Sequence, residues 1–343
     1  MRLPKEKKLP RIALIGGETL AGREIQEVLE KCGNPPVTVF GASGEGNFGE
    51  DEGEAVYLRA FDEAAVEEAD VVVVAGSEAG AEKAYQLAVR GSGGGERRVI
   101  DATGFLDEKP EAWIATGLEE AEGNGGRGSL FVVAHPAAMA VNLVLSRLGA
   151  AAKVVRAVME VFEPASQFGK RGIHELQQQT SALLGFRQLE RKVFDAQLSF
   201  NLLAALGEEA PTPLIKTEHR IQSHLATLLN RTVRPMAVPM PSLRLVQAPV
   251  FHGYSISCWV EFASAPDVET VGAALASEEI EVRGKDHEMP TNVGVAGQSG
   301  VQVGDIRADA NCGRAIWLWA VADNLRMTAN AVERLTMGAE KRQ

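Results

Sequence analysis

Residues 11–33 read RIALIGGETLAGREIQEVLEKCG, and this stretch decides the fold class. After Arg11, residues 12–15 form an apolar run that is followed by Gly16 and Gly17, as in a buried parallel strand followed by a tight turn. After Thr19, apolar residues recur at helical spacing until Gly33, at Leu20, Ile25, Val28 and Leu29. The stretch therefore predicts a strand, a glycine turn and an amphipathic helix.

The next hundred residues repeat this alternation. Strands are predicted at 37–43, 69–77 and 97–104, and a helix is predicted at 79–91. The acidic, glycine-rich segment 44–55 predicts a loop. Since βαβ crossovers are right-handed and produce parallel sheets, residues 1–134 are expected to form a Rossmann-like domain with a parallel sheet.

After residue 150 the pattern changes to long strands interleaved with helices. This indicates an α+β domain over residues 135–315, and the C-terminal helical segment 316–343 is expected to complete the first domain. The segments behind this interpretation are a long strand at 153–166, helices at 169–185 and 220–230, a long strand or hairpin at 242–264, and a closing helix at 322–343.

Composition excludes several classes of function. The chain has 343 residues, of which 46 are acidic and 35 basic, and its net charge of −11 argues against a general binder of nucleic acid or of anionic membranes. The three cysteines form no CxxC pair, and the histidines show no metal-ligand spacing. No apolar segment approaches the ~18 residues that span a bilayer. We expect a cytoplasmic protein without a metal site.

The glycine turn is the candidate cofactor site. Gly16 and Gly22 fit a GxxGxxG spacing, but Thr19 stands at the middle glycine, where its Cβ is expected to crowd a pyrophosphate. The candidate residues are Gly16, Gly17, Thr19, Leu20, Gly22 and Ser43.

The end of the second predicted strand also lacks the groups that usually hold a cofactor ribose. This strand ends VFGAS with no acidic residue, and Glu45 stands where a 2′-phosphate would require an arginine. The expected result is weak binding of NAD or NADP, with no strong choice of NADP, or a turn that binds nothing.

A second motif, VVAHPAAMAVNL at 132–143, joins a strand to a helix through His-Pro. Many enzymes mount a nucleophile at such an elbow, because the helix N-terminus stabilises an anion there. Here the elbow contains Ala137, Ala138 and Met139, and none of these side chains can attack a substrate. It is either an ordinary turn or a catalytic elbow without its nucleophile.

Motifs along nearly the whole chain resemble aspartate-semialdehyde dehydrogenase. The segments that carry the resemblance are the glycine turn, VIDATGFLDEK (99–109), VAHPAAMAVNL (133–143), VFEPASQFGKRGIHEL (161–176), APVFHGYSISCWVEF (248–262) and CGRAIWLWAVADNLRMTANAV (312–332). The resemblance implies an NAD(P)-binding domain, a dimerisation domain, a homodimer and a place in amino-acid biosynthesis.

The resemblance also implies which positions should carry the chemistry. In that family a cysteine attacks the aldehyde, a glutamine positions it, a histidine acts as acid and base, and arginines bind the substrate carboxylate and phosphate. In this sequence the cysteine position is Ala138, the glutamine position Glu163 and the histidine position Tyr254. The arginine positions are Gln247 and Leu106, and a family lysine is matched by Arg220.

The chain therefore resembles most the cysteine-less branch of the family. The leading interpretation is a homologue that has lost aldehyde oxidation and acts through binding, with a mixed dimer with a catalytic paralogue as one form of it. The alternative is a semialdehyde dehydrogenase with residual or altered NAD(P)-linked activity. His135, Glu163, Tyr254 and His252 are expected to converge on the old cleft, either as a remodelled site or as structural partners of one another.

Overall fold

The computed structural model describes residues 9–51, 54–90, 97–118, 129–231, 238–284 and 286–338. Two compact units divide the chain. The first combines the residues up to Ala134 with those from Thr328 onward, and the second comprises His135–Met327. Among the described residues, no helix is both long and apolar enough to cross a membrane.

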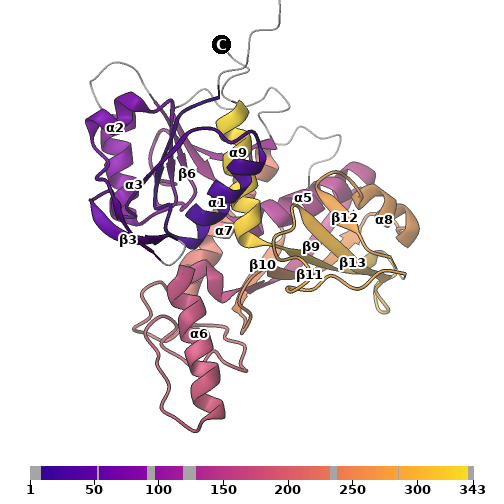
Figure 1. Ribbon diagram of the computed structural model, residues 1–343. Helices are drawn as coiled ribbons and strands as arrows, with labels where there is room; N and C mark the ends of the chain where they lie inside the picture. Colours follow the sequence, from indigo (N-terminus) through magenta and orange to yellow (C-terminus); the bar gives the residue numbers. More distant parts are fainter. Residues whose placement is uncertain are drawn as a thin grey trace, which may run out of the picture. The chain divides into compact units, whose positions relative to one another are not determined.

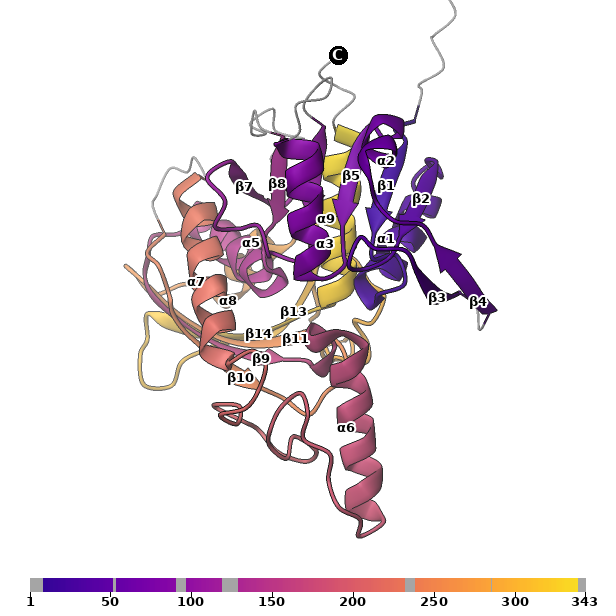
Figure 2. The ribbon, with the colours of Figure 1, turned by 90° about the vertical axis from the view of Figure 1, so that its left-hand side faces the viewer.

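The first unit is built on a six-stranded parallel sheet with the order β2-β1-β5-β6-β8-β7. Helices α1 and α9 lie on one face of this sheet, and α2 and α3 lie on the other (Figures 1 and 2). The predicted doubly wound parallel sheet is therefore confirmed. The strands are β1 (Ile12–Ile15), β2 (Val37–Phe40), β5 (Val71–Val74), β6 (Arg98–Asp101), β7 (Ala112–Ala115) and β8 (Leu130–Val133).

Three helices of this unit begin at side-chain caps. The Thr19, Asp62 and Ser77 side chains each accept a hydrogen bond from a backbone N–H in the first turn of the helix that follows. These helices are α1 (Leu20–Lys31), α2 (Glu63–Glu68) and α3 (Glu78–Ala84), and α3 continues as the single π-turn η1 (Tyr85–Val89).

The acidic segment 44–55 is not wholly a loop as predicted. Its second half enters an antiparallel hairpin of β3 (Asn47–Asp51) and β4 (Glu54–Leu58). Glycine and acidic residues are poor strand formers, so their density hid the pairing from sequence reasoning. The edge strand β7 (Ala112–Ala115) was also missed by sequence reasoning.

The second unit is built on a mixed six-stranded sheet with the order β10-β9-β11-β14-β13-β12. Strand β9, next to the edge strand β10, runs parallel to β10 and antiparallel to β11. The segment 242–264 is therefore not a hairpin, because β9 lies between its two strands. The strands are β9 (Val154–Glu163), β10 (Ser242–Gln247), β11 (Tyr254–Phe262), β12 (Ile280–Val282), β13 (Val301–Ala308) and β14 (Ala315–Ala322).

Three helices of the second unit pack against one face of this sheet (Figure 2). They are α5 (Pro136–Ala151), α7 (Leu214–Arg231) and α8 (Val268–Leu275). The last helix of the chain, α9 (Asn324–Gly338), begins later than the predicted residue 316, since residues 315–322 belong to β14. Residues 339–343 of the predicted helix lie outside the described part of the chain.

An arm extends from the mixed sheet of the second unit. It consists of the short helix η2 (Ala165–Phe168), the long helix α6 (Gly169–Leu184) and the irregular segment that follows (Figure 2). A small apolar cluster, which includes Leu176, Phe194 and Leu198, lies between α6 and this segment. The segment has few regular backbone hydrogen bonds, so it depends on the side chains of α6 for partners.

Glu175 and Gln179 on α6 supply those partners. The Glu175 carboxylate accepts hydrogen bonds from the backbone N–H groups of Lys192, Val193 and Phe194 at 2.7, 2.6 and 3.1 Å. The Gln179 Oε1 atom accepts from the N–H groups of Leu198 and Ser199. One buried carboxylate therefore satisfies three consecutive amides.

We expect Glu175→Ala to lower the free energy of unfolding by about 2–4 kcal/mol, because it leaves buried N–H groups without an acceptor. Urea unfolding followed by circular dichroism measures the change. Lys170→Ala, at an exposed position of the same helix, is the matched control and should stay within about 0.5 kcal/mol of the wild type. Equal effects of the two substitutions would show that the carboxylate does not hold the segment.

Candidate functional site

The elbow predicted at 132–143 is present, and His135 is its N-cap. Pro136 is the first residue of α5, and the Nδ1 atom of His135 accepts a hydrogen bond from the Ala137 N–H at 3.3 Å. A nitrogen that accepts carries no proton, so the neutral ring carries its proton on Nε2. Ala138, the position expected for the nucleophile, is fully buried in the first turn of α5.

The His135 ring is surrounded by three polar side chains. The backbone N–H of His135 donates to Nδ1 of His224 at 2.9 Å. Its Nε2 atom lies 3.4 Å from Nε2 of Gln167 and 3.5 Å from the Tyr254 hydroxyl. Burial, together with His224 and Arg220, lowers the pKa of His135 from 6.5 to about 3. The ring is therefore neutral at physiological pH.

Tyr254 joins His135 to Glu163. The Tyr254 hydroxyl donates to Oε1 of Glu163 at 3.1 Å, and both side chains are fully buried. The two residues stand opposite each other because β11 begins at Tyr254 just as β9 ends at Glu163. Burial raises the pKa of Glu163 from 4.5 to about 8, against the opposing effect of the Tyr254 hydrogen bond. Glu163 is thus mainly an uncharged carboxylic acid at neutral pH.

Gln247 completes the group from the neighbouring strand. It pairs with Glu163 in the β10–β9 register, and its Nε2 atom donates to the Glu163 carbonyl oxygen at 2.9 Å. Its Oε1 atom and the Oε2 atom of Glu163 are buried and have no hydrogen-bond partner within the described residues. In the protonated acid Oε2 carries the proton and is a donor, whereas Gln247 Oε1 is an acceptor, so a water molecule is the kind of partner that could satisfy both atoms.

The cluster of His135, Glu163, Gln167, Tyr254 and Gln247, here termed the elbow cluster, can hold and pass a proton but contains no nucleophile. The hydroxyl of nearby Ser166 is hydrogen-bonded to Asn324 Oδ1 at 3.1 Å. The Cys258 thiol lies four residues further along β11 than Tyr254, is buried, and has its pKa raised by that burial. Neither residue has a general base bonded to it that could activate it.

The structure separates the other candidate residues. The carbonyl oxygen of His252 accepts a hydrogen bond from the Asn292 side chain. None of the described contacts joins His252 to the elbow cluster. Leu106 is buried in the first unit, where its N–H donates to Asp101 Oδ2. Sequence reasoning missed Gln167 and His224. Gln167 lies within the family motif at 161–176 but is not one of the positions to which the resemblance assigns a role, and His224 lies inside α7 without a motif around it.

The glycine turn between β1 and α1 is closely packed. A Cβ atom added at Gly16 would lie 2.4 Å from the Gly76 Cα atom, and one added at Gly22 would lie 2.1 Å from the Gly16 carbonyl oxygen. Thr19 directs its hydroxyl inward, where it accepts from the Gly22 N–H at 2.9 Å and contacts the Gly16 and Ala75 carbonyl oxygens. The Thr19 hydroxyl thus accepts one of the backbone N–H groups at the helix N-terminus, in addition to the crowding that its Cβ atom was expected to cause.

The segment after β2 is linked to the rest of the first unit by charged side chains. Glu18 accepts from the Ala42 N–H at 2.8 Å. Lys83 donates to the Gly44 carbonyl oxygen and pairs with Glu45 at 2.7 Å. Ser43 accepts from the Glu45 N–H. Sequence reasoning found no acidic residue at the end of this strand, because the carboxylate comes from the turn before α1.

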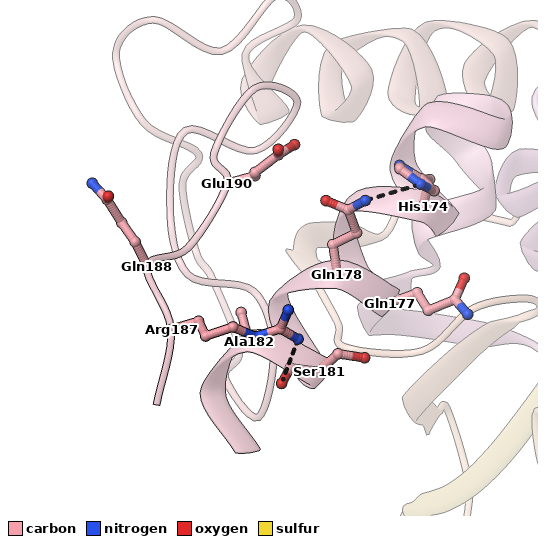
Figure 3. A pocket seen from close by; sticks show the side chains of 8 residues that line it. All are labelled: His174, Gln177, Gln178, Ser181, Ala182, Arg187, Gln188 and Glu190. Atoms are coloured by element: carbon pink, nitrogen blue, oxygen red, sulfur yellow. Dashed lines mark hydrogen bonds between the residues drawn. The ribbon is translucent and has the colours of Figure 1, made fainter. Parts of the chain in front are cut away.

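A polar cavity of about 470 Å³ lies along α6 in the arm, away from the residues of the elbow cluster (Figure 3). Two of its walls are held by internal contacts, between His174 and Gln178 and between Arg187 and the Ser181 carbonyl oxygen. Its lining is His174, Gln177, Gln178, Ser181, Ala182, Arg187, Gln188 and Glu190. No predicted site residue lines it. No cluster of metal-ligating side chains occurs among the described residues.

The two shifted pKa values of the elbow cluster predict how stability depends on pH. Glu163 stays protonated in the folded chain but ionises above 4.5 once unfolded, so its contribution to stability falls as pH rises from 4.5 to about 8. His135 stays neutral when folded but binds a proton below 6.5 once unfolded, so its contribution falls as pH drops from 6.5 to about 3. The two effects cancel between 4.5 and 6.5.

The substitution Glu163→Gln removes the pH dependence of stability that Glu163 causes and leaves that of His135 in place. Between pH 4.5 and 8, the difference in unfolding free energy between Glu163→Gln and wild type should change by about 1.4 kcal/mol per pH unit, in favour of the variant as pH rises. Urea unfolding at several pH values measures it. Glu160→Gln, on the same strand and exposed to solvent, is the control. A pH-independent difference would mean that Glu163 is charged in the folded chain.

Comparison with known proteins agrees with this geometry. Residues 145–327 match the family model described as semialdehyde dehydrogenase, dimerisation domain. The chain is 34% identical over 240 residues to a USG-1 protein homolog of Pseudomonas aeruginosa, covering 68% of this chain and 69% of the relative. It is 27% identical over 333 residues to an aspartate-semialdehyde dehydrogenase of Rickettsia bellii, covering 93% and 94%.

The fold has a close structural counterpart as well. The crystal structure of aspartate semialdehyde dehydrogenase II from Vibrio cholerae matches with a TM-score of 0.78 and 23% identity, covering 96% of this chain and 98% of that one. A parallel-sheet unit followed by a mixed-sheet dimerisation domain is thus shared along the length of the chain. The chain belongs to the aspartate-semialdehyde dehydrogenase family.

Proposed function

We propose that this family member has lost aldehyde oxidation and acts as a binding or partner protein. The observation that carries the proposal is Ala138, a methyl group buried in the first turn of α5 at the position where the family resemblance expects a cysteine. A thioester requires a sulfur nucleophile, and an alanine side chain cannot form one.

The contacts of the elbow cluster support the proposal. Glu163 and Tyr254, at the positions expected for the positioning glutamine and the catalytic histidine, are hydrogen-bonded to each other and fully buried. Gln247 stands where an arginine is expected, and its amide is bonded to the backbone of β9. The anionic groups of an aspartyl substrate would lose charge-assisted hydrogen bonds worth about 1.5–3 kcal/mol each.

The purified protein is expected not to oxidise aspartate semialdehyde with NADP and phosphate. The loss of covalent catalysis together with its positioning groups removes most of the rate enhancement. Reduction of the nucleotide, followed at its near-ultraviolet absorbance beside a catalytically active relative, is the measurement. Ala138→Cys alone should not restore turnover, because Gln247, Tyr254 and Leu106 remain.

The opposite outcome supports the alternative function. Turnover within about a hundredfold of the active relative, abolished by Tyr254→Phe or Glu163→Gln but not by the exposed control Glu160→Gln, would identify a semialdehyde dehydrogenase with altered residues. The comparison with both cluster variants ties any activity to this chain and excludes a contaminating enzyme.

We further propose that the chain forms a homodimer. The matched family model is a dimerisation domain, and the arm exposes several large apolar side chains that a monomer would leave in water. Leu184, Phe186, Phe200 and Leu202 are 72%, 100%, 69% and 57% exposed. A stable interface of this class buries ~2,000 Å² or more.

Sedimentation velocity at micromolar concentration should show the dimer mass. Phe186 has a left-handed backbone conformation with φ of 51°, which aspartate tolerates. Phe186→Asp should therefore weaken association without unfolding the arm, whereas Lys170→Asp on α6 should not. A folded wild-type monomer would contradict the proposal. Co-purification with a catalytic paralogue would instead indicate a mixed dimer.

We infer that any dinucleotide binds weakly to the first unit. Thr19 takes the Gly22 amide that a diphosphate would use, and Lys83 is paired with Glu45. The turn keeps the close backbone approach that a dinucleotide needs, since neither Gly16 nor Gly22 has room for a Cβ atom. When bound, the nicotinamide of the dinucleotide would supply hydride acceptance, and the backbone at Gly16, Gly17 and Leu20 would hold the diphosphate, with the Gly22 amide available only if Thr19 released it.

A further inference from the structure

The carboxylate of Glu18 stands at the end of β2, although its residue belongs to the turn before α1. Its Oε1 atom accepts from the Ala42 N–H at 2.8 Å, and Ala42 follows Phe40, the last residue of β2, by two positions. The end of the second strand is where a Rossmann domain places the acidic side chain that accepts from the ribose hydroxyls of NAD.

The second oxygen of this carboxylate has no hydrogen-bond partner among the described residues. Glu18 Oε2 is shielded from solvent as the side chain lies here, whereas the residue as a whole is only partly buried, so a ligand donor reaches this oxygen through a rotation of the carboxylate. A shielded carboxylate oxygen requires a donor, and a ribose hydroxyl is one. A phosphate at the same place could not supply it, because phosphate oxygens are acceptors and carry negative charge.

The neighbouring charges favour the same kind of ligand. Lys83 donates to the Gly44 carbonyl oxygen at 3.0 Å and pairs with Glu45 at 2.7 Å. Arg59 lies over the ring of Phe40, the last residue of β2, and pairs with Glu68 at 3.5 Å. A 2′-phosphate would therefore approach two carboxylates, Glu18 and Glu45, while both cations are already paired with carboxylates. Like charges at such short range disfavour binding.

We propose that Glu18 is the specificity-determining residue of the turn, and that it selects a nucleotide with a free ribose diol, such as NAD, over one with a 2′-phosphate, such as NADP. This inference rests on the weak dinucleotide binding proposed above and gives it a preference. The residue type at position 45 is secondary, because its carboxylate is paired with Lys83 whereas the Glu18 carboxylate is not paired with a cation in the contacts described here.

Titration calorimetry of the full chain with NAD and with NADP tests the proposal. The wild type should bind NAD at least tenfold more tightly than NADP. Glu18→Gln keeps an oxygen that can accept from Ala42 and removes the charge, so the ratio of the two dissociation constants should fall at least fivefold. Glu27→Gln removes one charge from the exposed side of α1, where Glu27 pairs with Lys31, and should leave the ratio unchanged.

Thr19→Gly provides the second variant. It frees the Gly22 amide and should tighten NAD and NADP by the same factor, and glycine is tolerated at an N-cap, so the helix is expected to form. Circular dichroism checks that each variant folds. This variant separates the strength of diphosphate binding from the choice of ribose.

Three results would overturn the assignment of Glu18: equal affinity for NAD and NADP in the wild type, tighter NADP, or a ratio that Glu18→Gln leaves intact. Failure of both nucleotides to bind wild type and Thr19→Gly at 10 mM, about the upper limit of such titrations, would overturn it too. Micromolar NADP binding would contradict the weak-binding inference itself. Weak but equal binding would contradict the role of Glu18 alone.

Discussion

Burial of the Glu163 carboxyl group beside a single hydrogen-bond donor raises its pKa to about 8, and both neighbouring strands of the second unit contact this residue. Glu163 ends β9, the strand between β10 and β11, so both neighbouring strands contribute a side chain beside it. Tyr254 donates to the carboxyl group and Gln247 donates to its backbone. A charged Glu163 would break this arrangement, because neither neighbour brings a cation.

Neutrality also explains the state of the elbow. His135 caps α5 through Nδ1, which only a neutral ring can do, and its lowered pKa keeps it neutral. The cluster thus holds three titratable side chains, His135, Glu163 and Tyr254, whose pKa values burial shifts toward the uncharged form. Aldehyde oxidation by the mechanism described for this family would instead require charged groups that bind the anionic substrate, and a nucleophile that itself becomes an anion. This contrast supports the binding role proposed above for this member of the family.

The parallel sheet of the first unit could be predicted from sequence because its buried strands are continuous apolar runs, such as Val71–Val74, separated by glycine turns. The hairpin of β3 and β4 could not, since acidic residues and glycine mask its alternation. The place of β10 was also unpredictable, because a parallel partner distant in sequence leaves no local signal.

In the elbow cluster, Glu163 and Tyr254 were found through family motifs, whereas Gln167 and His224 meet His135 only in three dimensions. Glu18 was missed because a long side chain reaches a neighbouring strand end.

The position of β10 outside β9 has a consequence for the order of folding. These two strands are parallel neighbours, but the arm and α7 lie between them in the chain. The entropic cost of closing so long a loop falls if the intervening residues have already become compact. The arm has its own apolar cluster and its own backbone partners on α6, so it can form as a local nucleus. We therefore expect β10 to add to the sheet late, so that Gln247 reaches Glu163 only when the sheet edge is complete.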